Sequence, residues 1–80
     1  MTCIKVIIPA YNEEGSIASV INDIPNTVDE IIVVNNNSSD NTVINAKQAG
    51  ATVLDEVQKG YGYACLKGME YISNQKTKPD

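Results

Sequence analysis

The chain has 80 residues, of which 42% are hydrophobic, and a formal net charge of -4 at pH 7. This length allows one small domain or part of one. Because the chain is acidic and has no stripe of basic residues, nucleic acid is not an expected partner. No apolar run approaches the roughly 18 residues that a membrane span needs. With only Cys3 and Cys65, no disulfide framework or metal knuckle is expected, and without a signal peptide ahead of the first strand we expect a cytoplasmic protein.

The first half of the chain alternates between strand and helix signals. Ile4 to Pro9 is predicted to form a strand, and the β-branched run from Glu30 to Val34 a second strand that is covered on both faces. Between them, apolar residues recur at helical spacing, namely Ile17, Val20, Ile21 and Ile24. Pro25 is expected to stop this helix.

The second half repeats the alternation. Ser38 or Ser39 is predicted to cap a helix whose dipole favours Asp40, and Gly50 to end it. Ala51 to Leu54 is predicted to form a third, short strand. A third helix is predicted from one apolar face, made of Tyr61, Cys65, Gly68, Met69 and Ile72. The polar residues 74–80 are expected to fray.

This order predicts an α/β fold of the βαβαβα type, half of a three-layer, Rossmann-like doubly wound domain. Two right-handed crossovers give a parallel sheet with strand order 3-2-1. The strand Ile4 to Ile8 then lacks a neighbour on one side, so the chain resembles a truncated domain. We expect it to self-associate through this hydrophobic edge or to be marginally stable.

Three segments follow strands and converge at the carboxyl edge of such a sheet, where ligands bind. In "PAYNEE", Tyr11 offers a ring for stacking and Glu13 a carboxylate, although Glu13 and Glu14 can equally serve the helix dipole. In "NNNSSD", the asparagines suit either an Asn-rich turn or a binding site. In "KGYGYAC", Cys65 stands where a dinucleotide fingerprint needs its third glycine, so that motif is a weak match.

Three stretches in order, "VIIPAYNEEGSIASVI", "EIIVVNNNSSDNT" and "GATVLDEVQKGYGYACLKGMEYI", resemble the N-terminal half of the family 2 glycosyltransferases of the GT-A fold. The resemblance covers residues 4–73. The third stretch looks most like the polyprenyl-phosphate (dolichyl-phosphate) mannosyl- or glucosyltransferase branch. It implies an inverting enzyme that moves a sugar from a nucleoside-diphosphate sugar to an acceptor, here a polyprenyl phosphate, at the cytoplasmic membrane face.

The resemblance also implies roles for individual residues. Nucleotide contacts are expected from Pro9, Ala10, Tyr11, Glu13, Asn35, Asn37, Lys59 and Gly60. Glu13 would hold the ribose hydroxyls, and Lys59 would lie near the phosphates unless it is a plain solvated charge. The family usually has acidic residues at Asn35 and Asn36, and glycine at Asn37, where an asparagine tolerates a left-handed backbone.

Because the carbonyl of the Asn35 amide can accept the imide N–H of uracil while its NH₂ group donates, the amide favours a UDP-sugar over GDP-mannose. The family's Asp-x-Asp motif would follow residue 80, so the ligands of a divalent metal, Mg²⁺ or Mn²⁺, are expected outside this chain. No catalytic or metal-binding residue is therefore assigned here, and the chain alone is expected to be inactive. The alternative is a non-catalytic nucleotide-binding or assembly module.

Overall fold

The computed structural model describes residues 4–76 and shows six elements that alternate between strand and helix. They are β1 (Lys5–Ala10), α1 (Ile17–Asn22), β2 (Glu30–Asn35), α2 (Thr42–Gln48), β3 (Thr52–Asp55) and α3 (Tyr61–Lys76). The strands form one parallel sheet in the order β1-β2-β3, with Ile7 opposite Ile32 and Val34 opposite Leu54. The predicted βαβαβα fold and the 3-2-1 strand order are confirmed.

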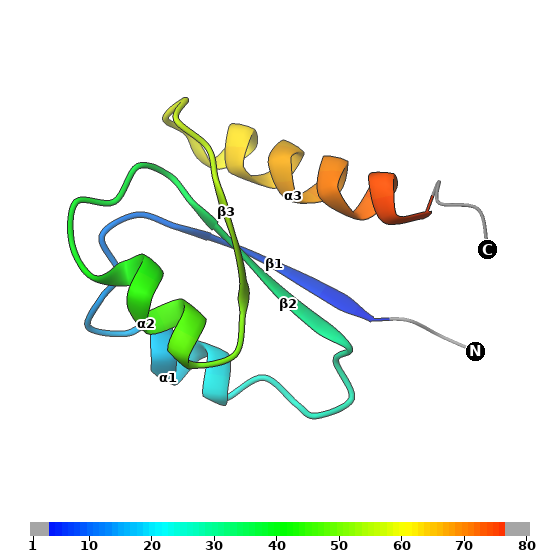
Figure 1. The fold of residues 1–80 in the computed structure, drawn as a ribbon, viewed down its shortest axis with the longest axis horizontal. Helices are drawn as coiled ribbons and strands as arrows, with labels where there is room; N and C mark the ends of the chain where they lie inside the picture. Colours follow the sequence, from blue (N-terminus) through cyan, green and yellow to red (C-terminus); the bar gives the residue numbers. More distant parts are fainter. Residues whose placement is uncertain (1–3, 77–80) are drawn as a thin grey trace.

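The sheet is covered on both faces (Figure 1), with α1 and α2 on one side and α3 on the other. Alternate residues of β2 supply the two cores, because successive side chains of a strand point to opposite faces. Val33 packs with Ile17 and Ile21 on the α1–α2 side. Ile32 and Val34 pack with Ala64 on the α3 side. All three β2 residues are fully buried, as expected for the central strand of a parallel sheet.

The predicted apolar face of α1 is only partly correct. Ile17 and Ile21 are buried, whereas Val20 is 44% exposed. The helix ends at Asn22, ahead of Pro25, and is too short to bury a wider stripe.

The predicted apolar face of α3 is only partly correct, because Gly68 is buried and Ile72 packs on the core but Met69 does not. Ala64 and Gly68 are buried and Met69 is 59% exposed. A Cβ added at Gly68 would lie 2.7 Å from Cγ2 of Ile7, so the missing side chain lets the helix approach β1 closely. The small residues Ala64 and Gly68 therefore lie closest to the sheet, and the larger Tyr71 and Ile72 pack against the same core while partly buried.

The helix α3 continues to Lys76, so residues 74–76 are helical, while the fraying expected of the tail stays a prediction. No glycine or proline interrupts the segment from Ile72 to Lys76, so nothing in it stops the helix. Residues 77–80 lie outside the described residues.

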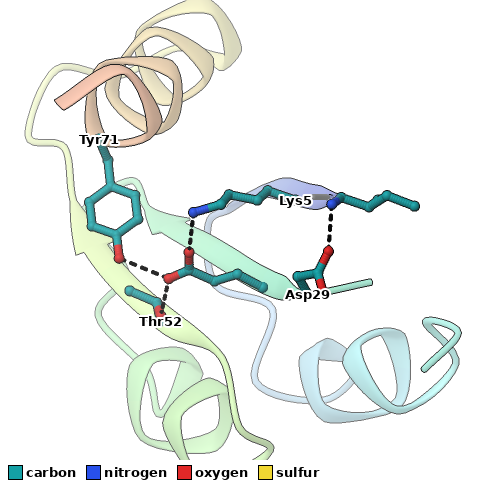
Figure 2. A network of polar contacts seen from close by, with 6 residues as sticks. Lys5, Asp29, Thr52 and Tyr71 are labelled. Carbon is teal, nitrogen blue, oxygen red and sulfur yellow. Dashed lines mark hydrogen bonds and ion pairs between the residues drawn. The ribbon is translucent and has the colours of Figure 1, made fainter. Parts of the chain in front are cut away.

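A polar network ties α3 to the amino end of the sheet (Figure 2). The Glu30 carboxylate accepts hydrogen bonds from the Tyr71 hydroxyl at 2.8 Å and the Thr52 hydroxyl at 2.9 Å, and pairs with the Lys5 ammonium at 3.0 Å. Burial raises the pKa of Glu30, but the hydrogen bonds from Tyr71, Lys5 and Thr52 outweigh it and hold this pKa below its usual value. The Glu30 carboxylate of β2 thus binds one side chain each from β1, β3 and α3, at the end of the sheet opposite the carboxyl ends of the strands.

Candidate functional site

The loops after β1, β2 and β3 meet at the carboxyl edge of the sheet and leave two hollows there. The first, here called the Tyr11 hollow, has a volume of about 220 Å³ and is lined by Pro9, Ala10, Tyr11, Glu13, Asn36, Gly60 and Ala64. The second, the Asp55 hollow, has about 320 Å³ and is lined by Asn35, Asn37, Asp55, Glu56 and Val57.

The Tyr11 hollow brings together most of the residues expected to contact a nucleotide. Tyr11 is 51% exposed, so its ring face is accessible for stacking. One oxygen of the Glu13 carboxylate accepts the Ser16 hydroxyl at 3.0 Å. Gly60 has a φ of 131°, which a side chain would strain, and it presents its backbone to the hollow.

Asn35 and Asn37 lie elsewhere, on the Asp55 hollow. Asn35 is 7% exposed, and its side chain donates to Oδ1 of Asp55 at 3.0 Å and accepts the Ser38 N–H at 3.0 Å. Asn36, which was not among the expected nucleotide contacts, lines the Tyr11 hollow instead. Asn35 ends β2, and consecutive residues of a strand point to opposite sides, so neighbouring asparagines serve different hollows. This alternation is the sequence signal that identifies Asn36.

Two further expectations concern single residues. Asn37 has a φ of 63°, which confirms the left-handed conformation predicted for it. Lys59 is exposed and lines neither hollow.

Ser38 and Ser39 do not cap α2, because the helix begins at Thr42 and its N-cap residue, Asn41, makes no side-chain cap. Both serines instead bind the turn after β1. The Ser38 hydroxyl accepts the Asn12 N–H at 2.9 Å, and Oδ1 of Asn12 accepts the Ser39 N–H at 2.9 Å. Asn12 reaches this position with a φ of 51°. The capping prediction is wrong because a contact distant in sequence replaces the local one.

Asp40 and Thr42 extend this connection between the two loops. The Thr42 hydroxyl donates to the Asp40 carboxylate and accepts the Glu13 N–H at 2.8 Å. Oδ1 of Asp40 also accepts the Thr42 N–H at 3.0 Å, and Oδ2 the Glu14 N–H at 3.3 Å. The hydrogen bond from the Thr42 hydroxyl, with those from the two backbone N–H groups, holds the pKa of Asp40 below its usual value. The segment carrying Tyr11 and Glu13 is therefore fixed by backbone bonds to the next loop.

Among the residues that the structure describes, the acidic and thiol side chains do not gather into a metal site. Within residues 4–76, no three His, Cys, Asp or Glu side chains gather closely enough to hold a metal ion. The same residues include no helix that is both long and apolar enough to cross a membrane.

Comparisons with known proteins give a consistent result. A family profile described as glycosyl transferase family 2 matches residues 5–75. RfbJ of Shigella flexneri is 49% identical over 61 residues, which cover 74% of this chain and 47% of RfbJ. An uncharacterized glycosyltransferase of Rickettsia typhi is 46% identical over 61 residues, covering 76% of this chain and 21% of its own length.

Among solved structures, one similar chain is glucosyl-3-phosphoglycerate synthase from Mycobacterium tuberculosis, in complex with Mn²⁺, uridine-diphosphate-glucose and glycerol 3-phosphate. It superposes with a TM-score of 0.78 at 36% identity, covering 86% of this chain and 29% of the synthase. The chain thus spans less than half the length of each of these relatives.

Proposed function

Because this chain belongs to glycosyl transferase family 2, we propose that residues 1–80 are the nucleotide-sugar-binding part of an inverting glycosyltransferase. Such an enzyme moves a sugar from a nucleoside-diphosphate sugar to an acceptor. The observation that carries the proposal is the Tyr11 hollow, in which one accessible ring, one carboxylate and one glycine backbone meet at the strand ends of a Rossmann-like sheet.

The Tyr11 hollow suits the nucleoside rather than the whole ligand. Its volume of about 220 Å³ is below the roughly 300–1,000 Å³ of sites that enclose a drug-sized molecule. The base stacks on Tyr11, and the ribose hydroxyls donate to the Glu13 carboxylate, of which one oxygen already accepts Ser16. The diphosphate then leaves the hollow past Gly60 towards Lys59.

The nucleotide is proposed to carry uracil as its base. The synthase with a TM-score of 0.78 was solved with uridine-diphosphate-glucose, which supports this choice. The Asn35 amide keeps one donor and one acceptor position beyond its bonds to Asp55 and Ser38, and Asn37 lies beside it on the Asp55 hollow. Because Asn35 lines the Asp55 hollow and not the Tyr11 hollow, this amide pairs with uracil only where a base stacked on Tyr11 extends across to the Asp55 hollow.

The acceptor is proposed to be a polyprenyl phosphate, and the location the cytoplasmic membrane face. Both rest on the likeness of residues 50–72 to the polyprenyl-phosphate branch. The synthase was solved with Mn²⁺, which supports a divalent metal, Mn²⁺ or Mg²⁺, in the whole enzyme. The acidic residues described here do not cluster to hold it, so the metal enters no step assigned to this chain.

Isothermal titration of UDP and GDP against the chain tests the proposal. We expect UDP to bind more tightly than GDP, and Tyr11→Ala to weaken UDP about 10-fold or more through lost stacking. Glu13→Gln should also weaken UDP, whereas Glu70→Gln, the same change on the exposed part of α3, should not. Tighter binding of GDP would overturn the uridine assignment, and binding of neither nucleotide would overturn the proposed function.

Self-association through β1 remains a separate proposal. Within residues 4–76, β1 pairs only with β2. The carbonyls of Ile4 and Ala10 accept hydrogen bonds from the β2 side. Because the backbone groups of successive strand residues point to alternate edges, those of Ile7 and Pro9 point to the open edge of β1. Pro9 has no N–H, which limits pairing to the first part of the strand. A concentration-independent monomer mass by light scattering, with high and cooperative thermal stability, would contradict this proposal.

A further inference from the structure

One buried side chain holds the loop between β3 and α3 in place. The Nδ2 group of Asn36 donates to the carbonyl of Glu56 at 2.9 Å and to the carbonyl of Gln58 at 2.6 Å. Its Oδ1 accepts the Gly60 N–H at 3.1 Å. Asn36 is 8% exposed, so these three bonds are largely shielded from water.

The same loop has little else to hold it. Val57 is 77% exposed, and residues 58–60 are exposed as well. The Gln58 N–H bonds only within the loop, to the carboxylate of Glu56 at 3.0 Å. The backbone bond from the Glu56 N–H to the Asn35 carbonyl fixes where the loop leaves the sheet, but not where it closes. Closure against the strand ends therefore depends on the Asn36 side chain.

These contacts use the donors that distinguish an amide from a carboxylate. An amide offers two N–H donors and a carbonyl acceptor, and Asn36 uses both kinds of group. An aspartate has no donor, so the carboxylate oxygen that replaces Nδ2 would face two carbonyl oxygens at hydrogen-bonding distance. Only the protonated acid, with one O–H, would restore part of the pattern.

We propose that Asn36 is a positioning residue that sets the wall of the nucleotide site by fastening the β3–α3 loop, and that this task requires a side chain that donates. The inference rests on the proposed function, because Asn36 and Gly60 line the Tyr11 hollow together. It also assigns a purpose to the amide at a place where the family commonly has an acid. The neighbouring asparagine, Asn37, is exposed and adopts a left-handed backbone in the turn, so the two residues have different structural roles.

Hydrogen exchange of the Gly60 amide in the chain without nucleotide tests the fastening directly. We expect Asn36→Asp near neutral pH to speed this exchange about 10- to 100-fold after correction for the intrinsic rate. Protection should return as the pH falls to about 4 and the new carboxyl group is protonated. Asn26→Asp adds the same charge to an exposed loop and should leave the exchange at wild-type values at each pH.

UDP affinity supplies the second measurement. Asn36→Asp should weaken UDP near neutral pH and recover relative to wild type in acid, while Asn36→Ala should weaken it at every pH. If Asn36→Asp fails to fold, the Gly60 exchange rate and the UDP affinity of Asn36→Ala decide whether Asn36 fastens the loop. Wild-type protection of Gly60 in both variants would overturn the fastening, and a loss in Asn36→Asp that does not change with pH would overturn the donor requirement. If wild type binds no UDP, the proposed function fails while the exchange still tests the fastening.

Discussion

The substitution Gly68→Ala tests whether α3 must pack closely against β1. The added Cβ would lie 2.7 Å from Cγ2, 2.9 Å from Cδ1 and 3.0 Å from Cγ1 of Ile7. Carbon atoms in contact prefer about 3.5–4.0 Å, so the helix must retreat from β1 by roughly 1 Å or Ile7 must leave its rotamer. Either movement loosens the packing of Ala64 against Ile32 and Val34.

The size of the effect follows from two opposing contributions. Overpacking a core typically costs about 1–3 kcal/mol, whereas alanine is favoured over glycine inside a helix by about 1 kcal/mol. We expect a net loss of about 1 kcal/mol in the free energy of unfolding, and a melting temperature lower by roughly 4–8 °C for each kcal/mol.

Urea denaturation followed by circular dichroism measures this loss, and Gly62 supplies a control in the same helix. A Cβ at Gly62 meets no atom within 4 Å, so Gly62→Ala should be neutral or slightly stabilising. Adding Ile7→Ala to Gly68→Ala should give a smaller total loss than the sum of the two single changes, because the clash is removed. A Gly68→Ala variant as stable as Gly62→Ala would refute the close approach.

Three further predictions concern stability. Glu30→Gln should cost about 1–3 kcal/mol near neutral pH. Because the pKa of Glu30 in the folded protein lies below its usual value, the difference from wild type in urea titrations should shrink as the pH falls through that folded pKa. Asp40→Asn should lower the melting temperature near neutral pH and lower it less in acid, because the Asp40 carboxylate, whose pKa is lowered in the folded protein, contributes stability only while it is charged. An equal fall in melting temperature at every pH would contradict this. Asn37→Ala should lose about 1 kcal/mol, and Asn37→Gly should lose less, because the φ of 63° disfavours a Cβ, as paired urea curves would show.

Much of the fold is encoded locally and could be predicted from the sequence. The β-branched run of β2 and the spacing of Ile17 and Ile21 identify a buried strand and an amphipathic helix from neighbouring residues alone. The strand order then follows from the handedness and length of the crossovers. Gly50 ends α2 with a φ of 100°, as its residue type indicates.

For the candidate site, the sequence could predict which segments form it but not every side chain that lines it. The sequence placed Tyr11 and Glu13 at a strand end, and the structure places both on one hollow with Gly60. It did not distinguish Asn35 from Asn36, because alternation along a strand puts neighbouring asparagines on opposite sides but does not say which side belongs to which hollow.

By itself, the sequence determined the periodicity of each element, and so the layers and topology of the sheet. Tertiary structure alone decided which side chains meet across loops. Ser38 binds the turn at Asn12 rather than a helix end, and Asn36 reaches a loop that follows it by 20 residues and more. The physical reason is that hydrogen bonds between distant segments depend on how those segments are brought together, and several polar residues of one type can satisfy the same local pattern.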